Sequence, residues 1–368
     1  MTAKKKSITL NDVAKYAGVS PRTVSNVVND WPYVSDETRE KVQQAIKVVG
    51  YRPNRMARSL VTGRTNTVGI IIQDISNPFF GPAIKGCEDV LFEHNYSFFL
   101  CDTNENEERE RYYLDLLISR AVDAVIIWGT RIDRDELSTV IGNALPFITI
   151  EFDGEPINPH HIIVNVDNIG GAQSATQHLI AQGYRAIAHL ASSQGRLTCQ
   201  QRLTGYRQAL EAAGRTVDSR LIQQGQPSTR GGYRAALKLL KEHSPDAIFC
   251  YNDLMAIGAI LAAEHLEMRV PDDVAIVGFD DIPMAAMIAP PLTTMRISQH
   301  ELGRLTGQLI MEHLKDKAAA SKSLIAPVEL QIRGSCGAKE FTKAQKRQLV
   351  ENLISSFSVD LPDGLPIE

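Results

Sequence analysis

The sequence is poor in cysteine and lacks any long apolar run. Its five cysteines in 368 residues form no C-x-x-C pair, so no disulfide framework, zinc site or other bound cofactor is indicated. Cys87, Cys101 and Cys250 lie in apolar runs, where we expect them to pack in the core. No stretch approaches the ~18 apolar residues of a membrane-crossing helix. Lysines 4–6 precede a polar-interrupted segment, so no export signal is indicated, and we expect a cytoplasmic protein without a membrane segment.

Motifs typical of catalysis are missing as well. The first apolar strand, in "VGIIIQDISNPFF", is not followed by a G-x-G-x-x-G loop, and we find no P-loop, nucleophile elbow or metal-ligand spacing. His160 and His161 adjoin Pro159 in a predicted loop, and we interpret both as exposed to solvent. We therefore expect no catalytic residues and no metal site, and an enzyme is the weakest of the functional hypotheses.

Charge is distributed unevenly along the chain. The formal charge is -4, but residues 1–65 carry a net charge of +7 and the remainder -11. A basic head on an acidic body is typical of an anion-binding module joined to a soluble domain. At 43% hydrophobic and 22% charged residues, the chain is long enough to fold into two or three domains.

Apolar periodicity divides the chain into three parts. In the first 65 residues the period is helical and predicts three short helices. From Thr67, seven predicted strands alternate with amphipathic stretches, which indicates a parallel sheet covered by helices on both faces. The strands lie in "TVGIII", "YSFFLC", "AVDAVIIW", "PFITI", "AIAHLA", "AIFCY" and "VAIVGF". The pattern restarts near Val164, so we predict two doubly wound α/β lobes within residues 67–336 and a ligand cleft between them. Residues 337–368 form an extension.

The amino-terminal segment has the signals of a helix-turn-helix. Thr9 can cap a first helix that Gly18 ends, and Ser20 and Pro21 can begin a second helix. The second helix of this motif enters the major groove. Its polar face carries arginine and asparagine, which suit guanine and adenine, beside hydroxyl residues that suit phosphates. The candidate DNA contacts in residues 1–52 are Thr9, Leu10, Ser20, Pro21, Arg22, Thr23, Ser25, Asn26, Asn29 and Tyr33.

Two further segments allow two interpretations each. Residues 53–66 can form a short hinge helix that needs a second subunit and DNA to become stable, with Leu60 inserting into the minor groove; the alternative is a flexible linker. In the extension, an apolar helical stripe runs from Leu349 to Phe357. It either packs on its own domain or joins subunits.

Several motifs occur in order along the chain, including "TLNDVAKYAGVSPRTVSNVVN", "GYRPNRMARSL", "VDNIGG" and "VPDDVAIVGFDD". They resemble the lactose-repressor/galactose-repressor family of bacterial transcription factors, and the likeness covers about nine-tenths of the chain. The resemblance implies a headpiece, a hinge helix and a core like type I periplasmic sugar-binding proteins. It implies specificity roles for Pro21, Arg22 and Asn26, although position 26 is often Arg in the family, so the operator sequence stays open. It also implies hinge contacts for Asn54, Ala57 and Arg58, with Leu60 as the intercalating leucine.

Polar residues at strand ends predict the effector site. Asp280 and Asn252 follow apolar strands, and Arg202 lies in the helix "RLTGYRQAL"; such groups point into the crevice of an open α/β sheet. Each has a structural alternative as a helix cap or ion pair. Similar residues contact the effector in the family. The resemblance also implies that Gln73, Asp74, Phe79 and Phe80 face the ligand, although either phenylalanine can equally well be a core residue. Pro227 stands where the family often has an aromatic residue.

We therefore expect a ligand-responsive transcriptional regulator, most simply a repressor. It would bind a pseudo-palindromic double-stranded DNA operator as a homodimer, with a tetramer left open, and would respond to a sugar-like effector in the cleft. Ligand closure of the cleft would alter formation of the hinge helix and so the affinity for DNA. The alternative is a small-molecule binding protein of the periplasmic type, which predicts an export signal and no headpiece.

Overall fold

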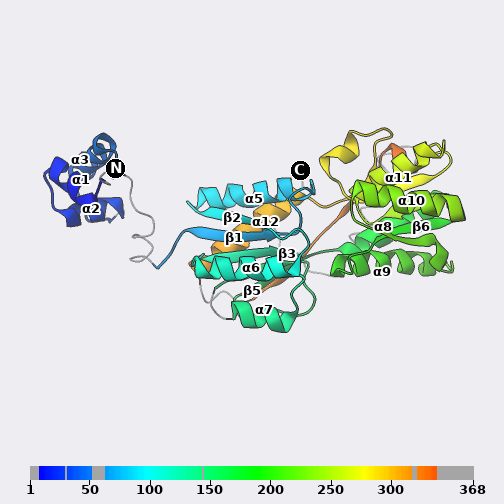
Figure 1. The fold of residues 1–368 in the computed structure, drawn as a ribbon, viewed down its shortest axis with the longest axis horizontal. Helices are drawn as coiled ribbons and strands as arrows, with labels where there is room; N and C mark the ends of the chain where they lie inside the picture. Colours follow the sequence, from blue (N-terminus) through cyan, green and yellow to red (C-terminus); the bar gives the residue numbers. More distant parts are fainter. Residues whose placement is uncertain (1–7, 30, 52–62, 143–144, 317–320, 338–368) are drawn as a thin grey trace, which may run out of the picture.

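The computed structural model describes residues 8–29, 31–51, 63–142, 145–316 and 321–337. Three helices at the amino-terminal end form a separate small body, and two α/β lobes follow (Figure 1). The hinge candidates Asn54, Ala57, Arg58 and Leu60 and the extension 338–368 lie outside the described residues. None of the described helices combines the length and the apolar character that crossing a membrane requires.

The headpiece is a helix-turn-helix followed by a third helix. Its helices are α1 (Leu10–Ala17), α2 (Pro21–Val28) and α3 (Asp36–Val49). The predicted end signals are confirmed: the backbone N–H of Thr9 donates to Asp12 at 2.7 Å, Gly18 has a φ of 64°, and the Ser20 hydroxyl accepts from the backbone N–H of Thr23 at 3.1 Å. The apolar positions form its core, namely Val13, Ala14, Ala17, Val24, Val27, Val42 and Ala45.

The first lobe is built on a six-stranded sheet in the order β11-β5-β4-β3-β1-β2, all of whose neighbouring strands are parallel. Strands of this kind are covered on both faces, which explains why their sequences are almost continuously apolar. The strands are β1 (Thr67–Ile72), β2 (Ser97–Asp102), β3 (Ala124–Trp128), β4 (Phe147–Ile150), β5 (His161–Val166) and β11 (Ser323–Ala326); the helices are α5 (Phe80–Glu93), α6 (Glu107–Ser119), α7 (Arg134–Ile141) and α12 (Gln299–Lys315).

The second lobe repeats this design with the order β12-β10-β9-β8-β6-β7. Its strands are parallel except for the pair between β10 and the edge strand β12. The strands are β6 (Ile187–Ser192), β7 (Ile222–Gly225), β8 (Ala247–Cys250), β9 (Ala275–Asp280), β10 (Thr293–Arg296) and β12 (Glu329–Gln331); the helices are α8 (Asn168–Ala181), α9 (Leu197–Ala212), α10 (Thr229–His243) and α11 (Asp253–His265), with 3₁₀ turns η1 (Ser219–Leu221), η2 (Pro283–Ala286) and η3 (Gly334–Cys336).

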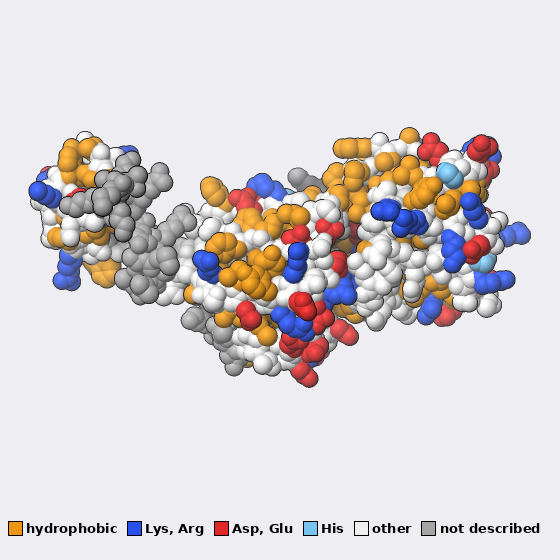
Figure 2. Space-filling view, viewed as in Figure 1, with side chains coloured by type: hydrophobic (Ala, Val, Ile, Leu, Met, Phe, Trp, Pro, Cys, Tyr) orange, Lys and Arg blue, Asp and Glu red, His pale blue; other side chains and the backbone are white. Residues whose placement is uncertain are grey.

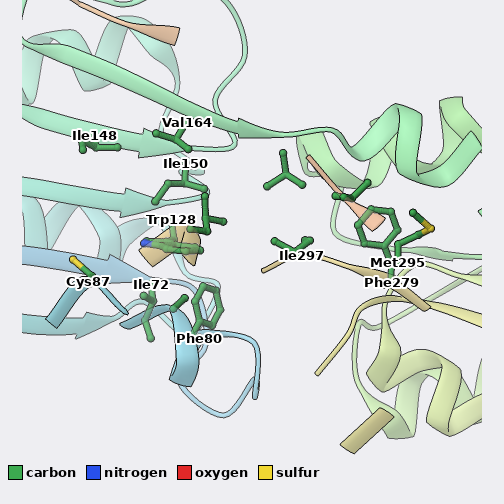
Figure 3. Packing of buried hydrophobic residues seen from close by; sticks show 14 of the residues in the cluster. Ile72, Phe80, Cys87, Trp128, Ile148, Ile150, Val164, Phe279, Met295 and Ile297 are labelled. Carbon is green, nitrogen blue, oxygen red and sulfur yellow. The ribbon is translucent and has the colours of Figure 1, made fainter. Parts of the chain in front are cut away.

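The chain crosses between the lobes at three places, and the first crossing lies beside the expected restart of the pattern near Val164. Val164 lies in β5, which pairs with β4 and β11 of the first sheet. The crossings follow β5, β10 and β11, because α8 packs in the second lobe, α12 returns to the first, and β12 belongs to the second sheet. In Figure 2 the two lobes meet along one boundary. Figure 3 shows buried residues on both sides of it, such as Ile150 and Phe279.

Helices α5 and α12 pack together unusually closely on one face of the first sheet. A Cβ at Gly303 of α12 would overlap with the backbone carbonyl oxygen of Ala83, and one at Gly86 of α5 with that of His300. Glycine at both positions therefore lets the two backbones approach. This contact joins α12 to residues more than 200 positions earlier in the chain.

One expectation about histidine is wrong. His161 is fully buried, with its ring stacked on Phe147 at a centroid distance of 4.2 Å. It is the first residue of β5, so the strand carries it into the first lobe instead of leaving it in a loop. His160 is half-buried. The cysteines Cys87, Cys101 and Cys250 are buried, as predicted from their apolar runs.

Candidate functional site

The headpiece presents the predicted DNA-contacting residues around α2. Arg22 is exposed near the start of this helix, and Asn26 and Asn29 are half-buried. Val24 and Val27 lie in the core on the other side of the helix, so its polar face is the one that can meet a ligand. The remaining candidates lie on α1 and α2 or beside them, and they are Thr9, Leu10, Ser20, Pro21, Thr23, Ser25 and Tyr33. Tyr33 is 87% exposed.

A cavity of about 210 Å³ lies where the two lobes meet. The loops that surround it follow the carboxyl ends of parallel strands in both sheets. Gln73 and Asp74 follow β1, Glu151 follows β4, Asn252 follows β8, and Asp280 ends β9. Ligands of open α/β sheets bind at this edge, so the topology directs polar side chains from two lobes toward one cavity.

All seven residues predicted for effector binding line this single cavity. They come from separate parts of the chain, and the parallel topology of two sheets brings them together. Their role in binding stays a prediction, whereas their position in the cavity wall is a property of the fold. The seven are Gln73, Asp74, Phe79, Phe80, Arg202, Asn252 and Asp280.

Arg202 is the most completely enclosed charged group in the cavity wall, at 3% exposure. Its Nε donates to Asn168 Oδ1 at 2.9 Å, its Nη1 donates to the carbonyl oxygen of Tyr251 at 2.6 Å, and its Nη2 lies 3.2 Å from Asp280 Oδ1. The guanidinium also stacks over the ring of Phe279 at 3.7 Å from the centroid. These contacts fix Arg202 in place and hold the Asp280 carboxylate at the cavity.

Asp280 lies in a strained turn that its neighbours maintain. Its φ of 113° is in the left-handed region, which costs about 1–3 kcal/mol for a residue other than glycine. The next residue, Asp281, anchors the turn through contacts of 2.7 Å to Arg296 and 2.7 Å to Arg333. Burial raises the pKa of Asp280 to about 6, although Arg202 acts in the opposite direction. Strain and a shifted pKa in one cavity wall are typical of functional sites.

Asn252 forms the helix cap that the sequence allowed, and its role in effector binding stays a prediction. Its side chain caps α11 by accepting from the backbone N–H of Met255 at 2.9 Å, and the residue also lines the cavity. The next residue, Asp253, is fully buried and accepts from the hydroxyl of Thr294 and from the backbone N–H of Ile282 at 2.8 Å. Burial raises the pKa of Asp253 well above its ordinary value, and the nearby Asp280 adds to this effect.

Comparison with known proteins identifies the family to which these two parts belong. The profile described as "Bacterial regulatory proteins, lacI family" matches residues 9–54. The profile described as "Periplasmic binding proteins and sugar binding domain of LacI family" matches residues 65–334. The chain belongs to the LacI family.

Individual relatives align over most of the chain. The HTH-type transcriptional repressor PurR of Photobacterium profundum is 34% identical over 329 residues, covering 89% of this chain and 98% of that protein. The structure of a transcriptional regulator CelR–cellobiose complex is similar, with a TM-score of 0.67 and 32% identity over 89% of this chain and 99% of that one. The lac repressor dimer bound to operator and the anti-inducer ONPF has a TM-score of 0.81 and 26% identity, covering 90% and 100%.

This LacI-family protein is therefore a DNA-binding transcriptional regulator with an effector-binding core. The match over residues 9–54 confirms the predicted regulator and disfavours the alternative of a binding protein without a headpiece. Its named relatives are transcriptional regulators and not enzymes. Among the described residues, no group of three or more histidine, cysteine, aspartate or glutamate side chains is arranged to hold a metal ion.

The LacI-family cavity also contains residues that the sequence did not single out. Most of them follow strands that the sequence did predict: Glu105 follows β2, Trp128 ends β3, and Gln194 follows β6. The rule applied to Asp280, that polar groups at strand ends face the crevice, would also have found Glu151. The missed lining residues are Asn77, Glu105, Trp128, Ile150, Glu151, Val166, Gln194, Gln226, Ser228, Tyr251 and Leu302.

Aromatic side chains line the cavity from both lobes. Phe79, Phe80 and Trp128 of the first lobe form a cluster of edge-on contacts with centroid distances of 5.4–5.8 Å. Phe80 is buried and belongs to the core, whereas Phe79 is half-buried. In the second lobe Pro227 lines the cavity, as its place in the sequence suggested, and Tyr251 supplies an aromatic ring there.

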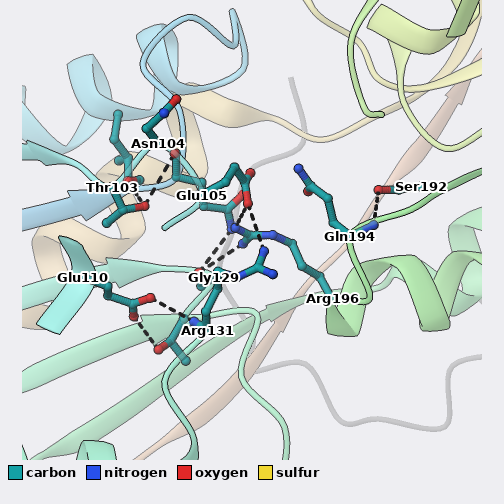
Figure 4. Close-up of polar contacts among 12 residues, drawn as sticks. Thr103, Asn104, Glu105, Glu110, Gly129, Arg131, Ser192, Gln194 and Arg196 are labelled. Carbon is teal, nitrogen blue, oxygen red and sulfur yellow. Dashed lines mark hydrogen bonds and ion pairs between the residues drawn. The ribbon is translucent and has the colours of Figure 1, made fainter. Parts of the chain in front are cut away.

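An arginine links the lobes at the edge of the cavity. Arg196, the residue before α9, pairs with the carboxylate of Glu105 and donates to the carbonyl oxygen of Gly129 at 3.1 Å (Figure 4). Glu105 and Gly129 belong to the first lobe. The loop after Gly129 is anchored in turn by buried Glu110, which accepts from the backbone N–H of Arg131 at 2.9 Å.

Proposed function

We propose that this regulator is a homodimeric repressor, located in the cytoplasm with its DNA, that binds a pseudo-palindromic operator. We propose further that it responds to a sugar-like effector held in the interlobe cavity by the seven predicted residues. The single observation that carries the proposal is that these residues, chosen from the sequence, all line one cavity between two lobes. A cavity with both aromatic walls and carboxylate, amide and guanidinium groups suits a ring that carries hydroxyls.

The dimer and the operator symmetry are supported by the relatives. A lac repressor dimer bound to operator aligns with 90% of this chain. Dimeric helix-turn-helix proteins place two recognition helices in successive major grooves, so their operators mirror the two-fold symmetry of the protein. In this chain α2 would be that helix, with Pro21, Arg22 and Asn26 nearest the bases. The four hinge candidates, Asn54, Ala57, Arg58 and Leu60, would contact the minor groove between the half-sites.

The sugar-like effector is supported by the cavity and by one relative. The CelR structure is a complex with cellobiose and aligns with 89% of this chain. Closing the cavity around a ligand would change how the two lobes sit and so how readily the segment 53–66 folds on DNA. The coupling can be no larger than the difference in ligand affinity between the two arrangements.

Operator selection from a random duplex library tests the DNA part. Full-length protein should enrich a pseudo-palindrome, its affinity should fall steeply with salt, and a variant lacking residues 1–65 should not bind. Equal affinity for all duplexes at every salt concentration would overturn the proposal. Sedimentation on the selected duplex should give two chains per operator and separates a dimer from a tetramer.

A thermal-shift screen with sugars, sugar phosphates and purines tests the effector part. A bound ligand should raise the melting temperature of the core by mass action. Asp280→Ala should abolish that shift, whereas Asp115→Ala, which removes an exposed carboxylate from α6, should preserve it. A shift that survives Asp280→Ala would place the ligand elsewhere.

A further inference from the structure

The wall of the effector cavity has an excess of negative charge. Four carboxylates line it, from Asp74, Glu105, Glu151 and Asp280, whereas Arg202 is the one cationic side chain among its described lining residues. On the outer face of the second lobe in Figure 2, by contrast, basic and acidic side chains are interspersed.

The charge of Arg202 is already matched within the protein. Three of its five N–H groups are used by Asn168, Tyr251 and Asp280, and the ring of Phe279 covers its plane. Asp280 neutralises the guanidinium, and Glu151 also lies within its electrostatic reach. A phosphate or carboxylate on a ligand would have to compete with these fixed partners for Arg202.

The other nearby cations reduce this excess but do not reverse it, because four carboxylates face three arginines when Arg196 and Arg131 are included. Arg196 and Arg131 both bind Glu105, from opposite lobes, so they offset a carboxylate of the wall. Behind Asp280 lies buried Asp253, whose carboxylate is 0% exposed and accepts from Thr294. Asp280 pairs with Arg202, and Glu151 lies within electrostatic reach of both Arg202 and Arg196. Burial raises the pKa of Glu151, which is the expected consequence of such surroundings.

We infer that the cavity accepts a ligand that is uncharged or positively charged at neutral pH, such as a sugar or an amino sugar, and rejects sugar phosphates and sugar acids. The inference rests on the proposed function, because it takes this cavity as the effector site. Hydroxyl and ammonium groups donate to carboxylates, whereas an anionic group brings a like charge next to the buried carboxylate of Asp280. The free-energy cost of placing an unpaired charge beside a like charge is one means by which a binding site excludes a competing ligand.

Matched sets of ligands on one ring test the charge preference. The probes are glucose, glucosamine and glucose 6-phosphate, with the corresponding galactose and mannose sets, measured by calorimetry on the full-length protein. In any set that binds, the neutral or amino member should bind at least about tenfold more tightly than the phosphate. Equal or tighter binding of the phosphate would overturn the inference while leaving the sugar effector in place.

Glu151→Gln removes one carboxylate from the cavity and keeps the shape of the side chain. It should raise the affinity for the phosphate relative to the neutral sugar about tenfold. Glu155→Gln removes an exposed carboxylate four residues away and should leave the ratio unchanged. An unchanged ratio in Glu151→Gln, with neutral-sugar binding retained, would also overturn the inference.

Operator binding measured on the same samples separates the two possible failures. If no member of any set binds while the operator still does, the proposed sugar class is wrong and the inference is wrong with it. If the operator does not bind either, the proposed regulator function fails at the DNA step, and the inference that rests on it fails too. Unchanged operator affinity in Glu151→Gln shows that the variant is folded.

Discussion

Arg196 of the second lobe forms an ion pair with Glu105 of the first lobe, across the edge of the effector cavity. The same guanidinium donates to the carbonyl oxygen of Gly129, which also accepts from Gln73 at 3.4 Å. Arg196 is only 8% exposed and Glu105 25%, so water screens the pair less than it would an open surface pair. The structure therefore holds the lobes together through groups that also border the ligand site.

Replacing Arg196 by alanine should loosen the closed arrangement. The loss of an ion pair and a hydrogen bond corresponds to about 1–2 kcal/mol, or roughly 5- to 30-fold in the ratio of closed to open protein. The radius of gyration of the ligand-free protein, measured by small-angle X-ray scattering, should increase. The apparent Kd of an effector that binds the closed form should rise by up to the same factor, because it varies with the inverse of the closed fraction.

Arg131→Ala is the matched control for this prediction. Arg131 contacts the same Glu105 carboxylate at 3.4 Å but lies in the same lobe, so its removal leaves the link between the lobes intact. Its radius of gyration should equal that of the wild type. If Arg131→Ala and Arg196→Ala expand the protein equally, the effect comes from freeing Glu105 and not from separating the lobes.

The buried histidine His161 should make the core sensitive to acid. Its Nδ1 accepts from the backbone N–H of Ile157 at 3.0 Å and its Nε2 lies 2.7 Å from Thr149 Oγ1, so a second ring proton would point at a donor. Burial lowers the pKa of His161 to about 4. Because the folded pKa lies below the unfolded one, the stability from the neutral ring is present above pH 6.5 and is lost as the pH falls toward 4.

Denaturant unfolding of wild type and His161→Gln between about pH 7.5 and 4.5 measures this effect. The difference in their free energies of unfolding should fall by about 1.4 kcal/mol per pH unit below about pH 6.5. Because both proteins contain the other groups that titrate in this range, the contributions of those groups cancel in the difference between the two free energies of unfolding. His243→Gln, at the exposed end of α10, is the matched control. A difference independent of pH for His161→Gln would show that this ring is protonated in the folded protein near its ordinary pKa.

Gly303→Ala should destabilise the first lobe. The added methyl group would overlap with the backbone carbonyl oxygen of Ala83 in α5, and two packed helices must separate to admit it. We expect the free energy of unfolding to fall by about 1–3 kcal/mol. Gly81→Ala, in α5 where a Cβ meets nothing within 4 Å, is the control and should be neutral or stabilising by up to about 1 kcal/mol. Equal effects at both positions would contradict the close helix contact.

Local patterns were enough to predict the three headpiece helices and seven strands of the core. They were also enough for the cavity residues Asn252 and Asp280, because the end of a parallel strand has a fixed relation to the sheet edge, whereas Gln73 was expected from the family resemblance. Local patterns do not say which sheet a strand joins, so the pairing of β11 with β5 in the first sheet and of β12 with β10 in the second was not foreseen. The pairing of Arg196 with Glu105 depends on how two sheets face each other, a long-range property that neither residue's neighbours in the sequence encode.

Asn26 should read one base pair of each operator half-site. An asparagine side chain on a recognition helix pairs with the N6 and N7 atoms of adenine, and a good pair contributes about 1–3 kcal/mol of discrimination. Asn26→Ala should therefore lose preference at one position per half-site, and Asn26→Arg should shift that preference to guanine. Binding is measured against duplexes with each base at every position of the selected operator.

Gln44→Ala on the exposed side of α3 is the control for the Asn26 variants and should leave the base preferences unchanged. The two possible roles of Asn26 differ in their pattern. If Asn26 pairs with a base, Asn26→Ala weakens binding only to duplexes with the preferred base, because the other duplexes never had the pair. If Asn26 instead binds a phosphate, the same substitution weakens binding to all duplexes equally. A uniform decrease in affinity for all duplexes would show that Asn26 contacts the DNA backbone. Sequence recognition would then depend on Arg22 and its neighbours on α2.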